Sequence, residues 1–304
     1  MTIKPEQPEV TSKKVTSKKD AIQRLFLCPG TGAGRLTGLI LHGLLFHGLF
    51  LVYPVSAETA CAVELLDRAH YDETTRLKFI YDGDTLHLQD GRKVRLIGIN
   101  TPELSHGDNT AEPYSAEAKQ ALKRLFEQDK TISLVFGREK HDHYKRLLAH
   151  GFTRDGSNIQ ATLLQQGLAH AITLPPNDQF SSCYRELERQ ARCKQRGFWK
   201  KTKLLTAKDL NRSDIGFKIV SGKVKKITIN TKGIWLNLDD NVTVGIRPDN
   251  QSLFDVDNIS QMLNHSVVVR GWVNKSDRET PYYIRIRHPS SMQSAEQFNC
   301  DQPS

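Results

Sequence analysis

The chain has 304 residues, which is more than one domain of ordinary size needs, and its 38% hydrophobic and 25% charged residues are typical of globular proteins. The net charge of +9 and the isoelectric point near 9.3 favour anionic partners, such as nucleic acid or a membrane surface. Residues 1–57 carry +4 of that charge, and the moderate remainder excludes an assignment of function from charge alone.

The first 57 residues have the three parts of an export signal. Residues 1–35 are polar and basic, an apolar run follows from Leu36 to Val55, and the small residues at 55–57 suit a signal peptidase. We expect cleavage there and an exported protein, either periplasmic or secreted. The alternative is an uncleaved membrane anchor, because the apolar run is nearly long enough to span a bilayer. In either case the rest of the chain lies outside the cytoplasm.

Cysteine usage agrees with export. Removing the leader leaves Cys61, Cys183, Cys193 and Cys300, an even number that suits an oxidising compartment. Sequence leaves their pairing open. A bridge between Cys183 and Cys193 is disfavoured, because the two lie ten residues apart on one predicted helix. The pairing we favour joins Cys61 to Cys183. The spacing of the cysteines fits no zinc site.

Residues 72–200 show a pattern of short strands and three helices. Asp-Gly pairs at 82–83 and 90–91 form turns, Ser115 and Asn158 can cap helices, and Gly167 can end one. Three strands, a helix, two strands and two helices predict an α+β fold, with three helices packed on a small five-stranded barrel. The expected elements are strands Leu77–Tyr81, Thr85–Gln89, Val94–Ile99, Thr131–Phe136 and Arg146–Thr153, and helices Ser115–Glu127, 158–167 and Ser182–Arg196.

The remaining chain predicts a second unit. Residues 58–71 would be the mature N-terminal segment, and residues 201–213 are a polar, lysine-containing linker. Residues 214–290 contain five further strand patterns, which predict another small β-barrel, with the oligonucleotide-binding (OB) type as one option. Residues 291–304 look like a loosely structured tail. The five strands are expected at Lys218–Ile229, Ile234–Leu238, Val242–Arg247, Ser266–Val273 and Tyr282–Arg287.

Arg95 to Glu103 is the segment best suited to phosphodiester chemistry. Hydrolysis adds charge to an anionic centre, so arginine forks, a carboxylate for the water and a hard cation are useful there. Arg95 lies on a strand that is apolar on both faces, which predicts a buried guanidinium that needs a partner. Pro102 then ends the strand and leaves Glu103 in a loop.

Five motifs in this order resemble those of the staphylococcal nuclease family. They are Asp82-Gly-Asp-Thr85, Arg95 through Glu103, Asp142-His-Tyr-Lys-Arg146-Leu-Leu-Ala, Gln166-Gly-Leu-Ala169 and Gly197-Phe-Trp199. The resemblance covers about 130 residues. It implies an OB-type barrel with three helices. It further implies that Arg95 and Arg146 clamp the phosphate, that Glu103 acts on the attacking water and that Tyr144 contacts the nucleotide.

The same resemblance implies a calcium site. Its ligands would be Asp84, position 100 and the backbone carbonyl of Thr101. The family has an aspartate where this chain has Asn100, which supplies an oxygen but one negative charge fewer. We therefore expect calcium as the cofactor with reduced affinity, and another divalent metal is the alternative. The segment after Ala169 also lacks the family's base-stacking tyrosines, so the substrate preference does not carry over.

Two local alternatives remain open at this stage. His141 and His143, with His106 nearby, could chelate a transition metal, although the segment is better described as a loop. Glu112 could replace Glu103 as the base, because the loop between them has no predicted structure.

The sequence as a whole predicts an exported, metal-dependent nuclease acting on DNA, RNA or both. The alternative is a catalytically weak or inactive extracellular nucleic-acid-binding module. We expect no stable protein partner, and a membrane contact only if the leader stays uncleaved. The C-terminal unit interleaves basic and aromatic residues, which suggests a role in affinity or localisation rather than chemistry. These residues are Lys223, Lys225, Lys226, Lys232, Arg247, Arg270, Arg285, Arg287, Trp235, Trp272, Tyr282 and Tyr283.

Overall fold

The computed structural model describes residues 70–105 and 110–300. The predicted leader, Cys61 and His106 lie outside these residues. No helix in the described part of the chain is long and apolar enough to cross a membrane.

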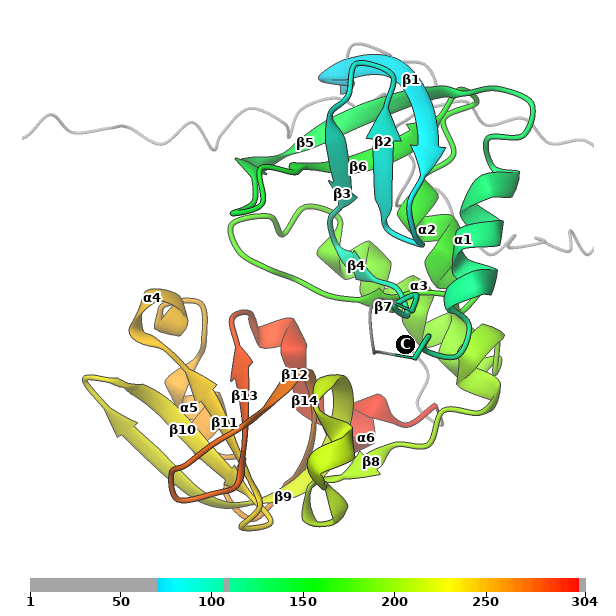
Figure 1. The fold of residues 1–304 in the computed structure, drawn as a ribbon. Helices are drawn as coiled ribbons and strands as arrows, with labels where there is room; N and C mark the ends of the chain where they lie inside the picture. The colour runs from blue at the N-terminus through cyan, green and yellow to red at the C-terminus, as the bar shows by residue number, and fades with distance from the viewer. Residues whose placement is uncertain (1–69, 106–109, 301–304) are drawn as a thin grey trace, which may run out of the picture. The chain divides into compact units, whose positions relative to one another are not determined.

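The first half of the described chain forms a closed five-stranded barrel (Figure 1). Its strands follow the order β1-β2-β3-β6-β5, and β3 and β6 run parallel while the other neighbours are antiparallel. Alternate apolar side chains point inward and form the core. The strands are β1 (Glu73–Ile80), β2 (Thr85–Leu88), β3 (Lys93–Leu96), β5 (Thr131–His141) and β6 (Leu147–Thr153).

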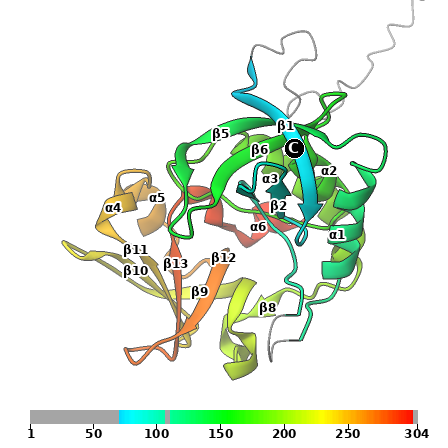
Figure 2. The same ribbon diagram turned by 45° about the horizontal axis from the view of Figure 1, so that its top comes forward.

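Three helices complete this core: α1 (Ser115–Arg124), α2 (Ile159–Gln165) and α3 (Ser181–Cys193). Figures 1 and 2 both show α1 and α2 side by side at the barrel. The predicted cap of α2 is confirmed, because the Asn158 side chain accepts the Ala161 N–H. The predicted cap of α1 is wrong. Tyr114 occupies the N-cap position, and the Ser115 hydroxyl donates to the Glu112 carbonyl instead.

Two glycines let the chain after α2 approach the chain after α3. Gly167 and Gly197 both have positive φ, and a Cβ on Gly167 would lie 2.2 Å from the Arg196 carbonyl oxygen. A Cβ on Gly197 would lie 2.1 Å from the Gly167 carbonyl oxygen. That carbonyl accepts the Phe198 N–H at 3.0 Å. Side chains at these positions would force the two backbones apart.

The predicted strand Val94–Ile99 is in fact two strands. β3 ends at Leu96, and β4 (Ile99–Asn100) pairs outside the barrel with β7 (His170–Ala171). Gly98 between them has φ +85°, and a Cβ there would lie 2.5 Å from the Tyr184 ring. The turn at this glycine takes the chain away from the barrel, so that Thr101 and Glu103 follow at its edge.

The second half of the described chain forms another closed barrel, with strand order β9-β10-β11-β13-β12 and closure by β12 on β9. Its third and fifth strands run parallel, as β3 and β6 do in the first barrel. This equivalence supports the OB type for both barrels. The ring contains β9 (Gly216–Asn230), β10 (Gly233–Leu238), β11 (Val242–Ile246), β12 (Ser266–Lys275) and β13 (Tyr282–Ile286), with α4 (Pro248–Gln251) and α5 (Val256–Ser260) between β11 and β12.

The predicted linker and tail are more ordered than their sequences indicated. In the linker, β8 (Leu205–Thr206) pairs with β9, and Ala207 and Leu210 are buried in the second core. In the tail, β14 (Met292–Ser294) pairs with β12, and α6 (Ala295–Phe298) buries Phe298. A few apolar residues within polar stretches suffice to anchor both segments.

Two cross-links connect α3 to the second half of the chain. Cys193 forms a disulfide with Cys300, 107 residues later. The Glu188 carboxylate pairs with Arg270 of β12, and both side chains are buried. Arg270 also donates to the Ala171 carbonyl at 2.9 Å. Cys183 is disulfide-bonded as well, and its predicted partner Cys61 lies outside the described residues.

Candidate active site

The turn between β1 and β2 places two carboxylates at the edge of the first barrel. One carboxylate oxygen of Asp82 accepts the backbone N–H groups of Asp84 at 2.9 Å and Thr85 at 2.7 Å, which fixes the turn. Both aspartates are buried. Gly83 is required between them, because a Cβ there would lie 2.7 Å from the Thr101 hydroxyl oxygen.

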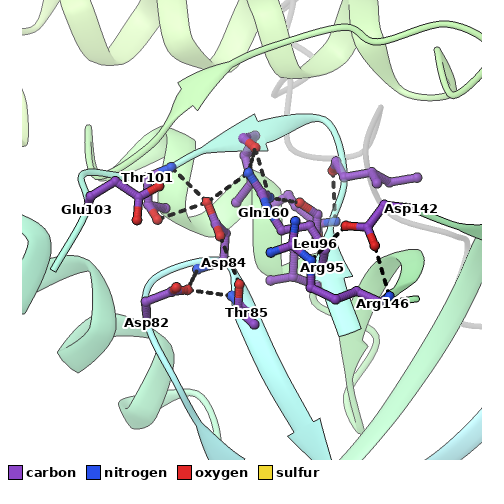
Figure 3. Close-up of polar contacts among 12 residues, drawn as sticks. Asp82, Asp84, Thr85, Arg95, Leu96, Thr101, Glu103, Asp142, Arg146 and Gln160 are labelled. Atoms are coloured by element: carbon purple, nitrogen blue, oxygen red, sulfur yellow. Dashed lines mark hydrogen bonds and ion pairs between the residues drawn. The ribbon is translucent and has the colours of Figure 1, made fainter. Parts of the chain in front are cut away.

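Asp84 connects the segments that meet at this edge. Its Oδ2 accepts hydrogen bonds from the backbone N–H and the hydroxyl of Thr101, each at 3.0 Å. The same oxygen lies 3.1 Å from Nη2 of Arg95 on β3. Figure 3 shows Asp84 between Thr101 and Arg95. Asp84 therefore joins the first turn, the third strand and the loop after β4.

Arg95 has the buried position and the partner that its strand predicted. Its side chain is 15% exposed, and Asp84 is the partner. Both Nη atoms also donate to the Ile99 carbonyl at 3.1 Å, and Nη1 donates to the Leu96 carbonyl. These bonds fix the orientation of the guanidinium group. Binding of a phosphate would therefore cost little side-chain conformational entropy.

Arg146 lies at the start of β6, which runs parallel to β3 and therefore brings it to the same edge. Its Nε donates to Asp142 Oδ2 at 2.7 Å, and its side chain is 28% exposed. Asp142 also accepts the N–H groups of Tyr144 and Arg146 at 2.9 Å. Burial opposes the charged form of Asp142, but the bonds from Arg146 outweigh it and lower the pKa of this carboxyl. A fork held at Nε can still present its two terminal nitrogens to a ligand.

Tyr144 lies in the exposed turn beside Arg146. Its side chain is 68% exposed, and the Arg146 guanidinium carbon is 5.5 Å from the ring centroid. The contact leaves the ring accessible to a nucleotide.

Glu103 follows Pro102 and is held by its backbone. Its N–H donates to Glu112 Oε2 at 2.9 Å, and its carbonyl accepts the Glu112 N–H at 2.8 Å. The Glu103 side chain is exposed at the surface. Partial desolvation, and then the charges of Asp84 and Asp82, raise the pKa of its carboxyl. Glu112, the alternative base, is thereby bound to the backbone of Glu103, which favours a positioning role for it.

In the view of Figure 3, Glu103 and Arg146 lie at opposite sides of the cluster, with Asp84 and Arg95 between them. A carboxylate, two guanidinium groups and buried acids therefore share one edge of the barrel. The arrangement can bind an anion and accept a proton from a water molecule next to it.

The three predicted calcium ligands lie on neighbouring segments. Asp84 bonds directly to Thr101, and Asn100, also buried, precedes Thr101 in the chain. Their side chains and carbonyls offer oxygen atoms only, which suits a hard divalent cation. Within residues 70–105 and 110–300, no three His, Cys, Asp or Glu side chains form a metal-binding group. The predicted site therefore depends on amide and backbone oxygens in addition to Asp84.

The charge balance of the cluster also suits a cation. Burial, and then the neighbouring Asp84 charge, raise the pKa of Asp82. After desolvation, the charges of the same two aspartates also raise the pKa of the Glu103 carboxyl. Arg95, whose side chain is partly buried, is the cation paired with Asp84 in this group. A divalent cation would reduce the repulsion among the acids, so the residues present fit such an ion.

The alternative histidine site finds no support among the described residues. His141 ends β5, and His143 packs its ring on Tyr144 at a centroid distance of 3.7 Å. Asp142 between them is engaged by Arg146. The metal-binding group that these histidines would need is not formed among the residues described.

Sequence reasoning missed several supporting contacts. Asp82, Asp142 and Glu112 each hold a predicted site residue or its loop through the hydrogen bonds above. Gln160, also in Figure 3, donates to the Ile97 carbonyl at 3.1 Å and accepts the Gly151 N–H at 3.1 Å. Among these residues, Asp142 and Arg146 are an oppositely charged pair four residues apart, and this spacing is a signal in the sequence for their ion pair.

Comparison with known proteins places Arg95, Glu103 and Arg146 within a recognised region. A family model described as staphylococcal nuclease homologue matches residues 93–201. The thermonuclease of Staphylococcus intermedius is 32% identical over 132 residues, which cover 42% of this chain and 77% of that protein. Endonuclease YncB of Bacillus subtilis is 33% identical over 135 residues, covering 43% and 63% respectively. The SPbeta prophage-derived endonuclease YokF of Bacillus subtilis is 30% identical over 148 residues, covering 48% and 47%. This chain thus spans less than two thirds of each Bacillus relative.

Proposed function

This chain belongs to the staphylococcal nuclease family, and on that premise we propose that it is an exported, metal-dependent nuclease that hydrolyses phosphodiester bonds in DNA, RNA or both. The observation that carries the proposal is the cluster at the edge of the first barrel. There Arg95 is fixed beside Asp84, and Glu103 and Arg146 lie at the two sides of the pair (Figure 3).

In this proposal the two arginines bind the scissile phosphate. Arg95 is held by the Ile99 carbonyl and Arg146 by Asp142, so both forks are oriented before the substrate arrives. As water attacks, negative charge grows on the phosphoryl oxygens. The guanidinium donors therefore stabilise the transition state more than the ground state. Tyr144, exposed beside Arg146, supplies a ring for the adjacent nucleotide.

Glu103 is the proposed general base. Its pKa is raised by desolvation and by the neighbouring acids, which makes the carboxylate a stronger proton acceptor. The bond from its N–H to Glu112 fixes the loop from which the side chain extends. The proton of the attacking water would move to the Glu103 carboxylate.

Asp84, Asn100 and the Thr101 carbonyl would hold the divalent cation. Such an ion, when bound, polarises the phosphate and neutralises part of its charge. Asn100 contributes an amide oxygen where an aspartate would add a full charge, so we expect weak calcium affinity.

The decisive experiment incubates the purified protein with single-stranded DNA and RNA, in calcium and in chelator, beside a Glu103→Gln variant. We expect cleavage that requires the metal and is abolished in the variant while folding, checked by circular dichroism, is intact. Binding without cleavage across several divalent metals would instead support the alternative, a catalytically weak nucleic-acid-binding module.

Export has its own test. We expect N-terminal sequencing of the protein recovered outside the cytoplasm to begin at Glu58, because the small residues at 55–57 precede it. Recovery in the membrane fraction with an intact N-terminus would instead identify the leader as an anchor.

A further inference from the structure

The second barrel has a hollow of its own, about 570 Å³ in volume. It lies between two loops and the outer face of the barrel wall. One loop joins β9 to β10, and the other joins β12 to β13. The lining residues are Lys232, Trp235, Arg247, Lys275, Ser276, Asp277, Arg278 and Tyr283.

The position of the hollow on the fold suggests what it does. Barrels of the OB type bind oligonucleotides and oligosaccharides on their second and third strands and on the loops that follow their first and fourth strands. Here β10 and β11 are the second and third strands. They contribute Trp235 and, at the end of β11, Arg247. Lys232 and residues 276–278 come from the two loops, and Lys275 ends β12.

The rim of the hollow is cationic. Lys232, Arg247, Lys275 and Arg278 are all exposed, and within residues 70–105 and 110–300 none of the four has a salt bridge. Asp277 is the one acid in the lining. Four positive charges against one negative charge around one hollow favour a polyanionic ligand.

The nearby acids do not neutralise this rim. Glu279, in the loop between β12 and β13, pairs with Lys226 at 2.8 Å. Asp249 pairs with Arg285 at 2.6 Å. Neither Lys226 nor Arg285 lines the hollow. Glu279 and Asp249 are therefore engaged by cations outside the hollow, and Asp277 is the acid that remains in its lining.

The floor of the hollow is aromatic. Trp235 and Tyr283 have ring centroids 6.3 Å apart, and the Arg278 guanidinium carbon lies 5.7 Å from the Trp235 centroid. Gly245 makes room for both rings, because a Cβ there would lie 2.6 Å from the Tyr283 ring and 2.8 Å from Trp235. A side chain at this position would displace both rings, so the glycine lets them approach the strand closely.

Trp235 is not needed by the core of the barrel. Its neighbours Ile234 and Leu236 point inward and belong to the core cluster, whereas Trp235 points outward and is half-buried. A half-exposed indole on the outer wall, beside unpaired cations, is suited to stacking on a nucleic-acid base.

We propose that this hollow binds single-stranded nucleic acid, with a base stacked on Trp235 and phosphates held by Lys232, Arg247, Lys275 and Arg278. A single strand is required because a base inside a duplex cannot expose its face to an aromatic ring. The site lies wholly in the second barrel and contains none of the proposed cleavage residues, so it does not depend on the proposed nuclease activity.

The test measures binding in chelator, where cleavage is not required. The probe is a fluorescent oligothymidylate of about 12 nucleotides, a length within the range of OB-type sites, and the readout is anisotropy. All variants are made in the full chain with Arg146→Ala, so that the nuclease site contributes less to the affinity. We expect Trp235→Ala to raise Kd about tenfold and Trp235→Phe to restore most of the affinity.

The matched control is Trp272→Ala, because Trp272 is another exposed indole (40%) and does not line this hollow. We expect less than about a twofold change in its Kd, which lies below the effect of removing one stacked base. Equal effects of Trp235→Ala and Trp272→Ala would overturn the proposal, and so would full affinity in a folded Trp235→Ala variant.

Salt dependence and an abasic strand test the rest of the proposal. Lys232→Gln with Lys275→Gln should reduce the slope of log Kd against log salt by about 0.7 for each phosphate that the protein no longer neutralises. The control Lys208→Gln, at an exposed lysine outside the hollow, should leave the slope unchanged. The abasic strand of equal length should bind about tenfold more weakly than oligothymidylate. Equal affinity for both would show a general polyanion site and overturn base stacking.

Discussion

The two barrels of this protein follow one strand order, with parallel third and fifth strands, yet their equivalent loops carry different chemistry. The loop after the first strand carries Asp82 and Asp84 in one barrel and Lys232 in the other. The loop after the fourth strand carries Asp142 paired with Arg146 in the first barrel. In the second barrel it carries Asp277 and Arg278, directly after Lys275 at the end of β12. The shared fold would place a ligand at the same loops in both barrels, and the residues of those loops would determine whether it is cleaved or only bound.

The third strands make the same contrast. In the first barrel Arg95 projects from this strand and is fixed among acids. In the second barrel Gly245 replaces a side chain with space for two aromatic rings. A cation held by acids suits a reaction in which charge develops, and an aromatic floor suits a ligand that is only held.

Arg95→Ala tests this contrast between a catalytic and a binding barrel, and it is the variant from which we expect the largest effect. We expect cleavage to fall roughly a thousandfold, as on removal of one preorganised charged donor, with kcat affected more than KM. Arg154→Ala is the matched control, because Arg154 belongs to the same barrel region and its side chain is 74% exposed. Comparable decreases in both variants would mean that Arg95 acts through stability, which thermal unfolding would reveal.

The next effect concerns the buried pair between α3 and β12. Burial opposes ionisation of Glu188, but Arg270 and His170 outweigh it and hold the pKa of this carboxyl at about 2, against 4.5 ordinarily. Because the pKa is lower in the folded state, the stabilisation is complete above about pH 4.5 and declines as the pH falls towards 2. Glu188→Gln, which leaves Arg270 buried without its partner, should reduce the free energy of unfolding by about 3 kcal/mol at neutral pH.

Denaturant unfolding between pH 7 and pH 3 checks this expectation. Glu186→Gln is the control on the same helix, since Glu186 is more exposed and pairs with Arg189 three residues away. It should cost less than about 1 kcal/mol. A Glu188→Gln variant with unchanged stability and unchanged pH dependence would contradict the role of this pair.

Asn100→Asp sharpens the comparison by adding a fourth acid to the cluster of Asp82, Asp84 and Glu103. We expect calcium to be bound about tenfold more tightly, because the ligand charge increases by one. The calcium concentration for half-maximal cleavage and calorimetric titration both measure this change. A weaker response to calcium would argue that Asn100 does not contact the ion.

The smallest effect is expected from Glu112→Ala. The variant frees the Glu103 N–H, so the loop loses a hydrogen bond while the proposed base remains. We expect kcat to fall about tenfold with little change in KM, because a small misplacement of a catalytic group affects the transition state. Glu117→Ala, at an exposed acid in the first turn of α1, should have no effect. An increase in KM alone would contradict a positioning role.

The local features of the fold could be predicted from the sequence. The Asp-Gly turns, the cap at Asn158 and the burial of Arg95 follow from residue types and short-range spacing. The break at Gly98 could not, because it depends on the Tyr184 ring, which is distant in sequence. The cap of α1 was wrong for a local reason, because Tyr114 takes the N-cap position and the Ser115 hydroxyl donates to the Glu112 carbonyl, three residues earlier.

The sequence predicted which residues form the candidate site, but not the hydrogen bonds that hold them in place. Arg95, Glu103 and Arg146 were chosen by resemblance, and their roles stay predictions until variants are measured. The contacts that hold these residues form only when segments separated in the sequence come together in the fold. Glu112 meets Glu103 across a loop, and Thr101 meets Asp84 across the barrel edge. The order of residues 201–213 and 291–300 was missed, because single apolar residues such as Phe298 give no periodic signal.

The Cys193–Cys300 disulfide makes the whole second barrel part of a covalent ring that begins and ends on α3. A protease cut anywhere inside that ring would leave the two barrels in one molecule until a reductant opened the bridge. The two ligand sites would also stay at a high effective concentration relative to each other. A strand released by one of the two proposed sites would then be recaptured by the other more often than by a second protein molecule. Reduction of a chain cut between the barrels would therefore separate the two proposed sites and leave the residues of each unchanged.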